Sequence, residues 1–380
     1  MSQNAFCPRQ EGLSREATIS LEETIHCEMR RFPLPGRWMI ITETTYPVRI
    51  RTMNNKPINV AETPQKLASL TSAIALAVVL TATVANAADV SVPTPQMTYR
   101  TIEIDGSKIA YREIGPHDKP TILLLHGVPS SSRMYDDLMR RLGNEYHLVA
   151  PDYPGFGNSE APSPQDYTYT FSHLAETIIK LTDALKLDRY VLFMQDYGAP
   201  VGMRVATTRP QSVIGTIFQN GNVYEEGLGP MWEKRKSFWN NRSELQAEVV
   251  KQHQSLAVTR ARHLGADPDI EAYNPDLWMD EYAYLNRPGQ DQIQSDLIFD
   301  YQNNIAAYPI WQSWLREHKP LTLVMWGKYD PAFTVAGANA FKKDLPEADI
   351  HILDAGHFAM DTKLAEVASF TRAYMARLPR

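Results

Sequence analysis

Three side chains that could act together in nucleophilic catalysis each follow an apolar run of the sequence. Asp196 lies in a Gln-Asp-Tyr-Gly turn, between the apolar run 190–194 and a helix-like segment. Asp330 follows the run 321–326, and His357 follows a third run shortly after it. Nucleophile, acid and histidine in this chain order form the pattern of a catalytic triad, here with a carboxylate in place of the usual serine.

A carboxylate nucleophile narrows the chemistry. Serine attacks a carbonyl carbon, whereas a carboxylate that displaces a leaving group from saturated carbon forms an alkyl ester. Water activated by His357, which Asp330 orients, would then hydrolyse the ester on Asp196. Each residue also has a plain structural interpretation, because Asp often caps helices and Asp-Pro is common in turns. Their order, and their shared position after strands, favour catalysis.

Two backbone amides are predicted to hold the negative charge that develops during ester hydrolysis. The His-Gly-Val-Pro segment 126–129 follows the buried-strand run 121–125, and its glycine permits a sharp turn. The amide of Val128 can then face the nucleophile, and Tyr197, the residue after the nucleophile, supplies the second amide. These amides and the following helix N-terminus are expected to keep Asp196 ionised.

The elements that must position these groups alternate between strand and helix. Two runs around the Asp-Gly pair 105–106 predict a hairpin, and the later short apolar runs predict a mostly parallel sheet covered on both faces. Residues 221–319 are rich in Trp, Tyr and polar residues without a strand pattern, which indicates a helical lid over the carboxyl ends of the strands. The chain then divides into a first part of the core (96–220), the lid (221–319) and a second part of the core (320–380).

The N-terminal part of the chain differs from the rest in its composition and pattern. Residues 69–84 form a small-apolar run that ends in Ala-Asn-Ala, too short for a membrane span of about 20 residues but suited to a secretory signal. We predict a signal peptide over 53–87 and an upstream leader or over-extended start over 1–52 without regular structure. A buried helix and a membrane anchor are the alternatives for the apolar run.

Cleavage of this signal would give a periplasmic or secreted protein with no stable membrane insertion. Both cysteines, Cys7 and Cys27, lie in the leader, so the mature domain would contain no thiol and no disulfide.

Composition excludes some partners. The chain is 43% hydrophobic and 22% charged, which is typical of a globular protein, and its net charge of −6 disfavours nucleic acid as a partner. The histidines show no metal-ligand spacing such as H-x-x-x-H with a carboxylate, so we predict no metal and no organic cofactor.

From about Thr101 to Leu378 the chain resembles the α/β-hydrolase superfamily, and within it the branch of epoxide hydrolases and haloalkane dehalogenases. The resemblance is carried by HG-x-P at 126–129, by D-x-x-G-x-G-x-S at 152–159, and by Asp196 where these enzymes carry a D-W-G elbow. It implies an α/β-hydrolase fold, with a mostly parallel eight-stranded sheet, helices on both faces and an inserted helical lid. It also implies a hydrolase that forms an alkyl-enzyme ester on Asp196.

The resemblance does not determine whether the leaving group is an epoxide oxygen or a halide. In haloalkane dehalogenases the residue after the nucleophile is a tryptophan that binds halide, and one branch has Asn at the x of HG-x-P. Here these positions are Tyr197 and Val128, neither of which offers that side-chain N–H. Other indole donors remain in the lid: Trp232, Trp239, Trp278, Trp311 and Trp314.

Epoxide hydrolases use lid tyrosines as proton donors, one of them in a Y-R-N stretch that Tyr301-Gln-Asn resembles. We therefore predict an epoxide hydrolase-like enzyme with Tyr301 as donor. A haloalkane dehalogenase is the alternative, and a non-catalytic ligand-binding relative is a third possibility. An ordinary esterase is disfavoured because the elbow has no serine. The second donor stays open among Tyr224, Tyr282, Tyr284 and Tyr308.

The predicted substrate is small, neutral and apolar, with water as the second reactant. Fluoroacetate-type dehalogenases carry arginines just after the nucleophile, and here Tyr197 and Pro200 stand in those places, which disfavours a small anionic substrate. The aromatic lid favours an apolar ligand, and we predict that Trp232 and Tyr224 contact it.

Overall fold

A computed structural model describes residues 28–34, 37–43 and 95–378, which belong to two separate units divided after Asp89. In the first unit, β1 (Glu28–Leu34) pairs antiparallel with β2 (Arg37–Glu43). The composition of residues 1–52 predicts no regular structure, and this hairpin differs from that expectation. Its two strands flank a Pro-Gly pair, which is a common turn sequence.

The predicted signal segment 53–87, Cys7 and Cys27 lie outside the described residues, so export stays a prediction. Among the helices that the structure does describe, none combines the length and apolarity needed to cross a bilayer.

The second unit contains an eight-stranded sheet in the order β10-β9-β8-β7-β5-β6-β4-β3. Only the β3–β4 and β4–β6 pairs are antiparallel, so the predicted mostly parallel sheet is confirmed. The strands are β3 (Thr98–Ile104), β4 (Ser107–Ile114), β5 (Thr121–Leu125), β6 (His147–Pro151), β7 (Tyr190–Gln195), β8 (Val213–Gln219), β9 (Thr322–Gly327) and β10 (Asp349–Leu353).

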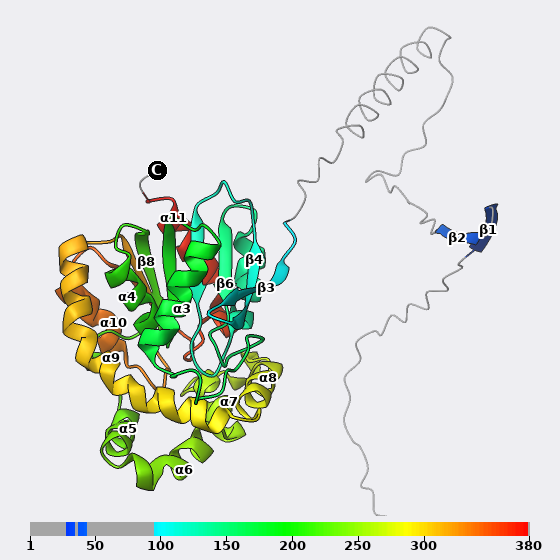
Figure 1. Cartoon of the computed structure of the whole chain (residues 1–380). Helices are drawn as coiled ribbons and strands as arrows, with labels where there is room; N and C mark the ends of the chain where they lie inside the picture. The colour runs from blue at the N-terminus through cyan, green and yellow to red at the C-terminus, as the bar shows by residue number, and fades with distance from the viewer. Residues whose placement is uncertain (1–27, 35–36, 44–94, 379–380) are drawn as a thin grey trace, which may run out of the picture. The chain divides into compact units, whose positions relative to one another are not determined.

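Helices cover both faces of the sheet because its central strands are apolar on both sides (Figure 1). Along β5, Leu123 and Leu125 pack into one hydrophobic cluster, and Ile122 and Leu124 pack into another on the opposite face. The first cluster includes α3 (Phe171–Ala184), α4 (Gly198–Thr208) and α10 (Val335–Ala340), followed by η4 (Phe341–Lys343). The second includes η1 (Ser132–Tyr135), α2 (Asp136–Leu142) and α11 (Met360–Met375).

The lid is inserted between β8 and β9 and lies along one edge of the sheet (Figure 1). Its longest helix, α9, contacts both α3 and α4 of the core, and the Phe171 amide at the start of α3 donates to Asp300 of α9 at 2.8 Å. The lid elements are η2 (Glu225–Gly227), α5 (Met231–Asn240), α6 (Arg242–His253), α7 (Leu256–Leu264), η3 (Ile270–Ala272), α8 (Asp276–Leu285) and α9 (Gln290–His318).

A buried ionic cluster also ties the lid to the core. His263 of α7 lies 2.7 Å from Glu281 of α8 and 2.7 Å from Asp361 at the start of α11. Burial alone would lower the pKa of His263, but the two carboxylates outweigh it and raise the pKa to about 10. His263 is therefore charged at neutral pH, and its ring stacks on Phe358, the neighbour of His357, at 4.4 Å.

Candidate active site

Asp196 occupies a strained turn between β7 and α4. Its φ of 47° is in the left-handed region, which non-glycine residues seldom adopt. Gly198 is required two residues later, since a side chain there would collide with the carbonyl of Leu125 on the neighbouring strand. The turn therefore presents the Asp196 carboxylate at the carboxyl edge of the sheet, as in a nucleophile elbow.

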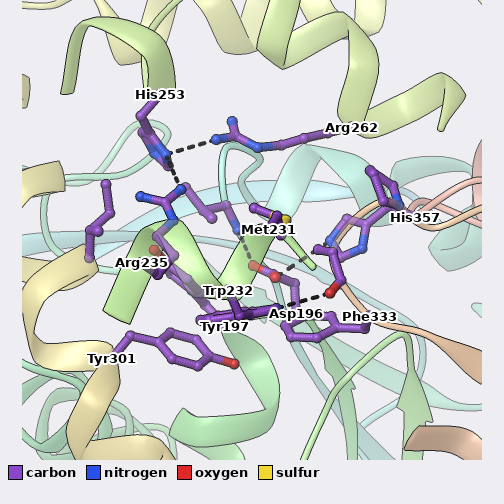
Figure 2. A pocket seen from close by; sticks show the side chains of 14 residues that line it. Asp196, Tyr197, Met231, Trp232, Arg235, His253, Arg262, Tyr301, Phe333 and His357 are labelled. Atoms are coloured by element: carbon purple, nitrogen blue, oxygen red, sulfur yellow. Dashed lines mark hydrogen bonds and ion pairs between the residues drawn. The ribbon is translucent and has the colours of Figure 1, made fainter. Parts of the chain in front are cut away.

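The structure brings the three predicted triad residues together (Figure 2). His357 Nδ1 lies 2.7 Å from Asp330 Oδ2, and His357 Nε2 lies 3.5 Å from Asp196 Oδ2. The other oxygen of Asp330 accepts the amides of Ala332 and Phe333 at 2.6 and 3.1 Å. The histidine thus stands between two carboxylates, and one of them is fixed by its own loop.

Protonation of His357 depends on both of these carboxylates. Burial by itself lowers the pKa of His357, but Asp330 and Asp196 outweigh it and raise the pKa to about 10. The resting histidine therefore carries a proton at neutral pH. Loss of the Asp196 charge would remove one of these two causes and would therefore lower the pKa of His357.

Asn220, which has no recognised motif in the sequence, also orients the triad acid. It follows β8 with a φ of 46°, and its Nδ2 donates to Asp330 Oδ2 at 2.6 Å. Its Oδ1 accepts the Gly327 amide at 2.7 Å, which ties the ends of β8 and β9 together. The Asn-Gly-Asn sequence directly after a strand is the one signal that marks this position.

Of the two predicted oxyanion amides, that of Val128 contacts the Asp196 carboxylate. The amide of Val128 donates to Asp196 Oδ1 at 2.8 Å. Gly127 is needed for this approach, because a side chain there would overlap Asp196 and Gln195. Tyr197 is the N-cap residue of α4, at the positive end of the helix dipole. Oδ1 of Asp196 is therefore bound by backbone, while Oδ2 faces His357.

The cavity next to Asp196 contains some of the predicted lid residues and excludes others. Both Trp232 and Tyr301 line it. The Tyr301 ring lies 4.5 Å from the Trp232 ring, and its buried hydroxyl has no hydrogen-bond partner among the described residues. Tyr224, predicted to contact substrate, does not line this cavity and instead donates its hydroxyl to Asp344 at 2.7 Å.

Indole donors are less available than the sequence indicates. Trp232 is the one lid tryptophan among the residues lining this cavity, and its Nε1 donates to the Ala332 carbonyl at 2.9 Å. Trp239 likewise donates to the Ile298 carbonyl, at 2.8 Å. Of the tyrosines considered as a second donor, none lines the cavity, whereas the side chain of Tyr197 does.

Two arginines and a histidine line the same cavity, and sequence reasoning missed them. Arg235 of α5, His253 of α6 and Arg262 of α7 form a cluster above Asp196 in Figure 2, which we call the cation cluster. Arginines on lid helices look like surface residues in the sequence, and only the packing of three helices brings these side chains inward. Their presence does not fit the predicted neutral, fairly apolar substrate.

One group in the described part of the chain has the composition of a metal site. Glu113, His117 and His147 place ligand atoms within 4.8 Å of one another. However, the Glu113 carboxylate is already paired with His147 at 2.9 Å and with Arg100 at 3.5 Å. His147 also begins β6, at the opposite end of the parallel strands from Asp196. We assign no metal to this group.

Comparison with known proteins agrees with this geometry. A family model described as alpha/beta hydrolase fold matches residues 120–364. An uncharacterized hydrolase of Saccharomyces cerevisiae is 41% identical over 269 residues, which cover 70% of this chain and 92% of the relative. A haloalkane dehalogenase of Psychrobacter cryohalolentis is 27% identical over 284 residues, covering 72% of this chain and 89% of the relative.

Among solved structures, the epoxide hydrolase CorEH without ligand superposes with a TM-score of 0.60 and covers 74% of this chain and 99% of its own. Its identity of 17% makes this a likeness of fold. The family model spans most of the described second unit, including Asp196, Asp330 and His357. The chain belongs to the α/β-hydrolase family, and haloalkane dehalogenases are among its sequence relatives.

Proposed function

We propose that this protein is an epoxide hydrolase-like enzyme that forms an alkyl ester on Asp196. The unequal surroundings of the two Asp196 oxygens carry the proposal. Oδ1 accepts the Val128 amide at 2.8 Å, whereas Oδ2 lies 3.5 Å from the His357 ring, next to the cavity. Oδ2 then attacks the substrate carbon, and Oδ1 becomes the ester carbonyl oxygen, already placed to receive negative charge.

Ester hydrolysis depends on a fall in the pKa of His357. Once Asp196 is esterified, its charge no longer raises the pKa of His357, and the imidazolium can release its proton through solvent to the Tyr301 phenolate that remains after protonation of the alkoxide. Neutral His357 then takes a proton from water as that water attacks the ester carbon. Asp330, held by Asn220 and two amides, stabilises the imidazolium that forms again.

The cavity favours an epoxide as the electrophile. Opening an epoxide leaves an alkoxide that needs a proton, and the buried Tyr301 hydroxyl has no geometrically defined hydrogen-bond partner among the described residues. Burial and the neighbouring Tyr308 raise the pKa of Tyr301, so the phenol holds its proton until a strong base forms beside it. The phenol of Tyr197, which lines the same cavity, is our candidate for the second donor.

A haloalkane dehalogenase is the second candidate function. It is favoured by the relatives of that name and by the cation cluster, whose guanidinium N–H groups could hold a departing halide. The occupied N–H of Trp232 counts against the usual indole donor.

Isotope labelling tests the shared intermediate. Single turnovers in 18O-water, with panels of epoxides and haloalkanes, should place label in the peptide that contains Asp196, because water attacks the ester carbon of the enzyme. The panel that turns over identifies the leaving group. An active substrate that leaves the Asp196 peptide unlabelled in mass spectrometry would rule out the ester route.

Tyr301→Phe tests the proton donor. Loss of the hydroxyl should lower kcat on epoxides by about 10²-fold or more, because the alkoxide would leave without a proton. Haloalkane turnover should change far less, since halide needs no proton. Tyr282→Phe, which removes a lid hydroxyl outside the cavity, is the matched control. Equal effects of Tyr301→Phe on both substrate classes would contradict the donor role.

A further inference from the structure

The cation cluster contains two arginines without a counterion of their own. Arg235 and Arg262 are partly buried, and both line the cavity next to Asp196. Within the described residues, neither forms an ion pair with a carboxylate within 4.0 Å. Nη1 of Arg262 is shielded from solvent and has no hydrogen-bond partner there. Unpaired cations are costly to bury, which indicates that an anion belongs at this place.

The histidine of the cluster cannot supply or accept a compensating charge. His253 Nδ1 lies 3.3 Å from a terminal nitrogen of Arg235 and 2.7 Å from one of Arg262. Guanidinium groups only donate, so Nδ1 must accept and the ring proton must sit on Nε2. Burial and the two arginines hold the pKa of His253 well below its ordinary value. His253 is therefore neutral.

A chain of hydrogen bonds from the lid to the core fixes this tautomer. His253 Nε2 donates to Gln294 Oε1 at 3.1 Å, and Gln294 Nε2 donates to Gln290 Oε1 at 3.0 Å. The Gln290 amide in turn donates to the Gly155 carbonyl at 2.6 Å. Each amide thus has one orientation, and the chain holds His253 as an acceptor for both guanidinium groups.

The charges around the cavity leave room for one further negative charge. Among the side chains that line the cavity, Asp196 is acidic and His357, Arg235 and Arg262 are basic. Together with Asp330, the partner of His357, these groups carry one positive charge in excess. Burial and Arg235 lower the pKa of Arg262 to about 10, which still leaves it charged at neutral pH. The apolar walls formed by Met231, Trp232 and Ile298 complete a cavity suited to an apolar chain with a charged end.

We propose that Arg235 and Arg262 bind a carboxylate of the substrate, whose other end presents the electrophilic carbon to Asp196. The planar guanidinium groups match the two oxygens of a carboxylate. The substrate is then an amphiphilic acid instead of the neutral molecule predicted from the sequence. The carboxylate subsite can be tested by binding measurements alone. Only the identity of the reacting end of the substrate rests on the proposed function.

Binding of an unreactive acid tests the subsite without any turnover. We would titrate the full protein with hexanoate and with hexanamide by calorimetry, at constant ionic strength and without halide or other carboxylates. Hexanoate should bind at least about tenfold more tightly than hexanamide, because a charge-assisted pair with arginine is missing from the amide. Equal affinities would overturn the proposal.

Variants on α7 locate the effect. Arg262→Gln should reduce the ratio of hexanoate to hexanamide affinity by about tenfold or more, and Arg262→Lys should reduce it less, because the charge remains but the fork is lost. Arg260→Gln, an exposed arginine on the same helix, should keep the wild-type ratio. Thermal unfolding of each variant shows whether it is folded, and Arg262→Lys decides the question if the glutamine variant is not. A wild-type ratio in folded Arg262 variants would refute the subsite.

Two further measurements distinguish a carboxylate subsite from a halide site and test the proposed reaction separately. Titration with bromide shows whether the arginines hold a halide: bromide binding lost in Arg262→Gln, with equal hexanoate and hexanamide binding, would assign the cluster to a leaving group. If epoxides turn over, kcat/KM for terminal epoxyhexanoate relative to epoxyhexane should fall in Arg262→Gln. Hexanoate selectivity without any epoxide turnover would keep the subsite and reject the proposed reaction.

Discussion

Asparagine in place of Asp196 is expected to lower kcat by at least about 10⁴-fold on every active substrate, because an amide oxygen is a poor nucleophile. The substitution is nearly isosteric, and the remaining oxygen can still accept the Val128 amide. The protein should therefore stay folded, with a thermal unfolding midpoint close to that of the wild type. Steady-state kinetics and circular dichroism measure the two quantities on one preparation.

A control substitution distinguishes loss of the nucleophile from the loss of any one negative charge. Asp188→Asn makes the same chemical change at an exposed position shortly before β7, and it should leave kcat unaltered. Activity of Asp196→Asn above about one hundredth of the wild type would mean that another group attacks the substrate.

Glutamine in place of His357 is expected to stop the reaction halfway. The Asp196 carboxylate can still attack, but no base activates the water, so the alkyl-enzyme should accumulate after a burst of one turnover per active site. Steady turnover should fall by about 10²- to 10⁴-fold. Intact-protein mass spectrometry would detect the adduct, and peptide mapping would place it on Asp196.

This trapping experiment has internal controls. The double variant Asp196→Asn/His357→Gln should show no adduct, and His318→Gln, at an exposed histidine, should turn over without accumulation. A His357→Gln protein that neither turns over nor accumulates adduct would indicate that the histidine is also needed in the first step.

The sheet and the proximity of the three candidate catalytic residues could be predicted because both follow from local patterns. Short apolar runs alternating with helical segments define a parallel sheet, and the carboxyl ends of such strands meet at one edge. Asp196, Asp330 and His357 each follow a strand, so their proximity is a consequence of topology. Asn220 follows a strand as well, but its role depends on β8 and β9 being neighbours and on an amide group that no motif singles out.

The lid could not be predicted in the same way. Tyr224 and Tyr301 are both lid tyrosines, and the difference between them is that Asp344, from the segment after α10, accepts the Tyr224 hydroxyl. Arg235 lies on α5, which packs on α9, and Arg262 lies on α7, which packs on α8, so the packing of these helices decides which way each side chain faces. Non-local packing of this kind leaves no periodic trace in the sequence, so a neutral substrate was the simplest expectation there.

The long helix α9 has a consequence for substrate length. Gln294, which accepts from His253, and Tyr301, the proposed proton donor, stand two helical turns apart on α9, or about 10 Å along its axis. The spacing of these two residues along α9 would then set the distance between the acid end and the reacting end of a bound substrate. Chain-length preference would be encoded in the pitch of α9, and deleting one residue between these two positions would rotate Tyr301 by about 100° out of register.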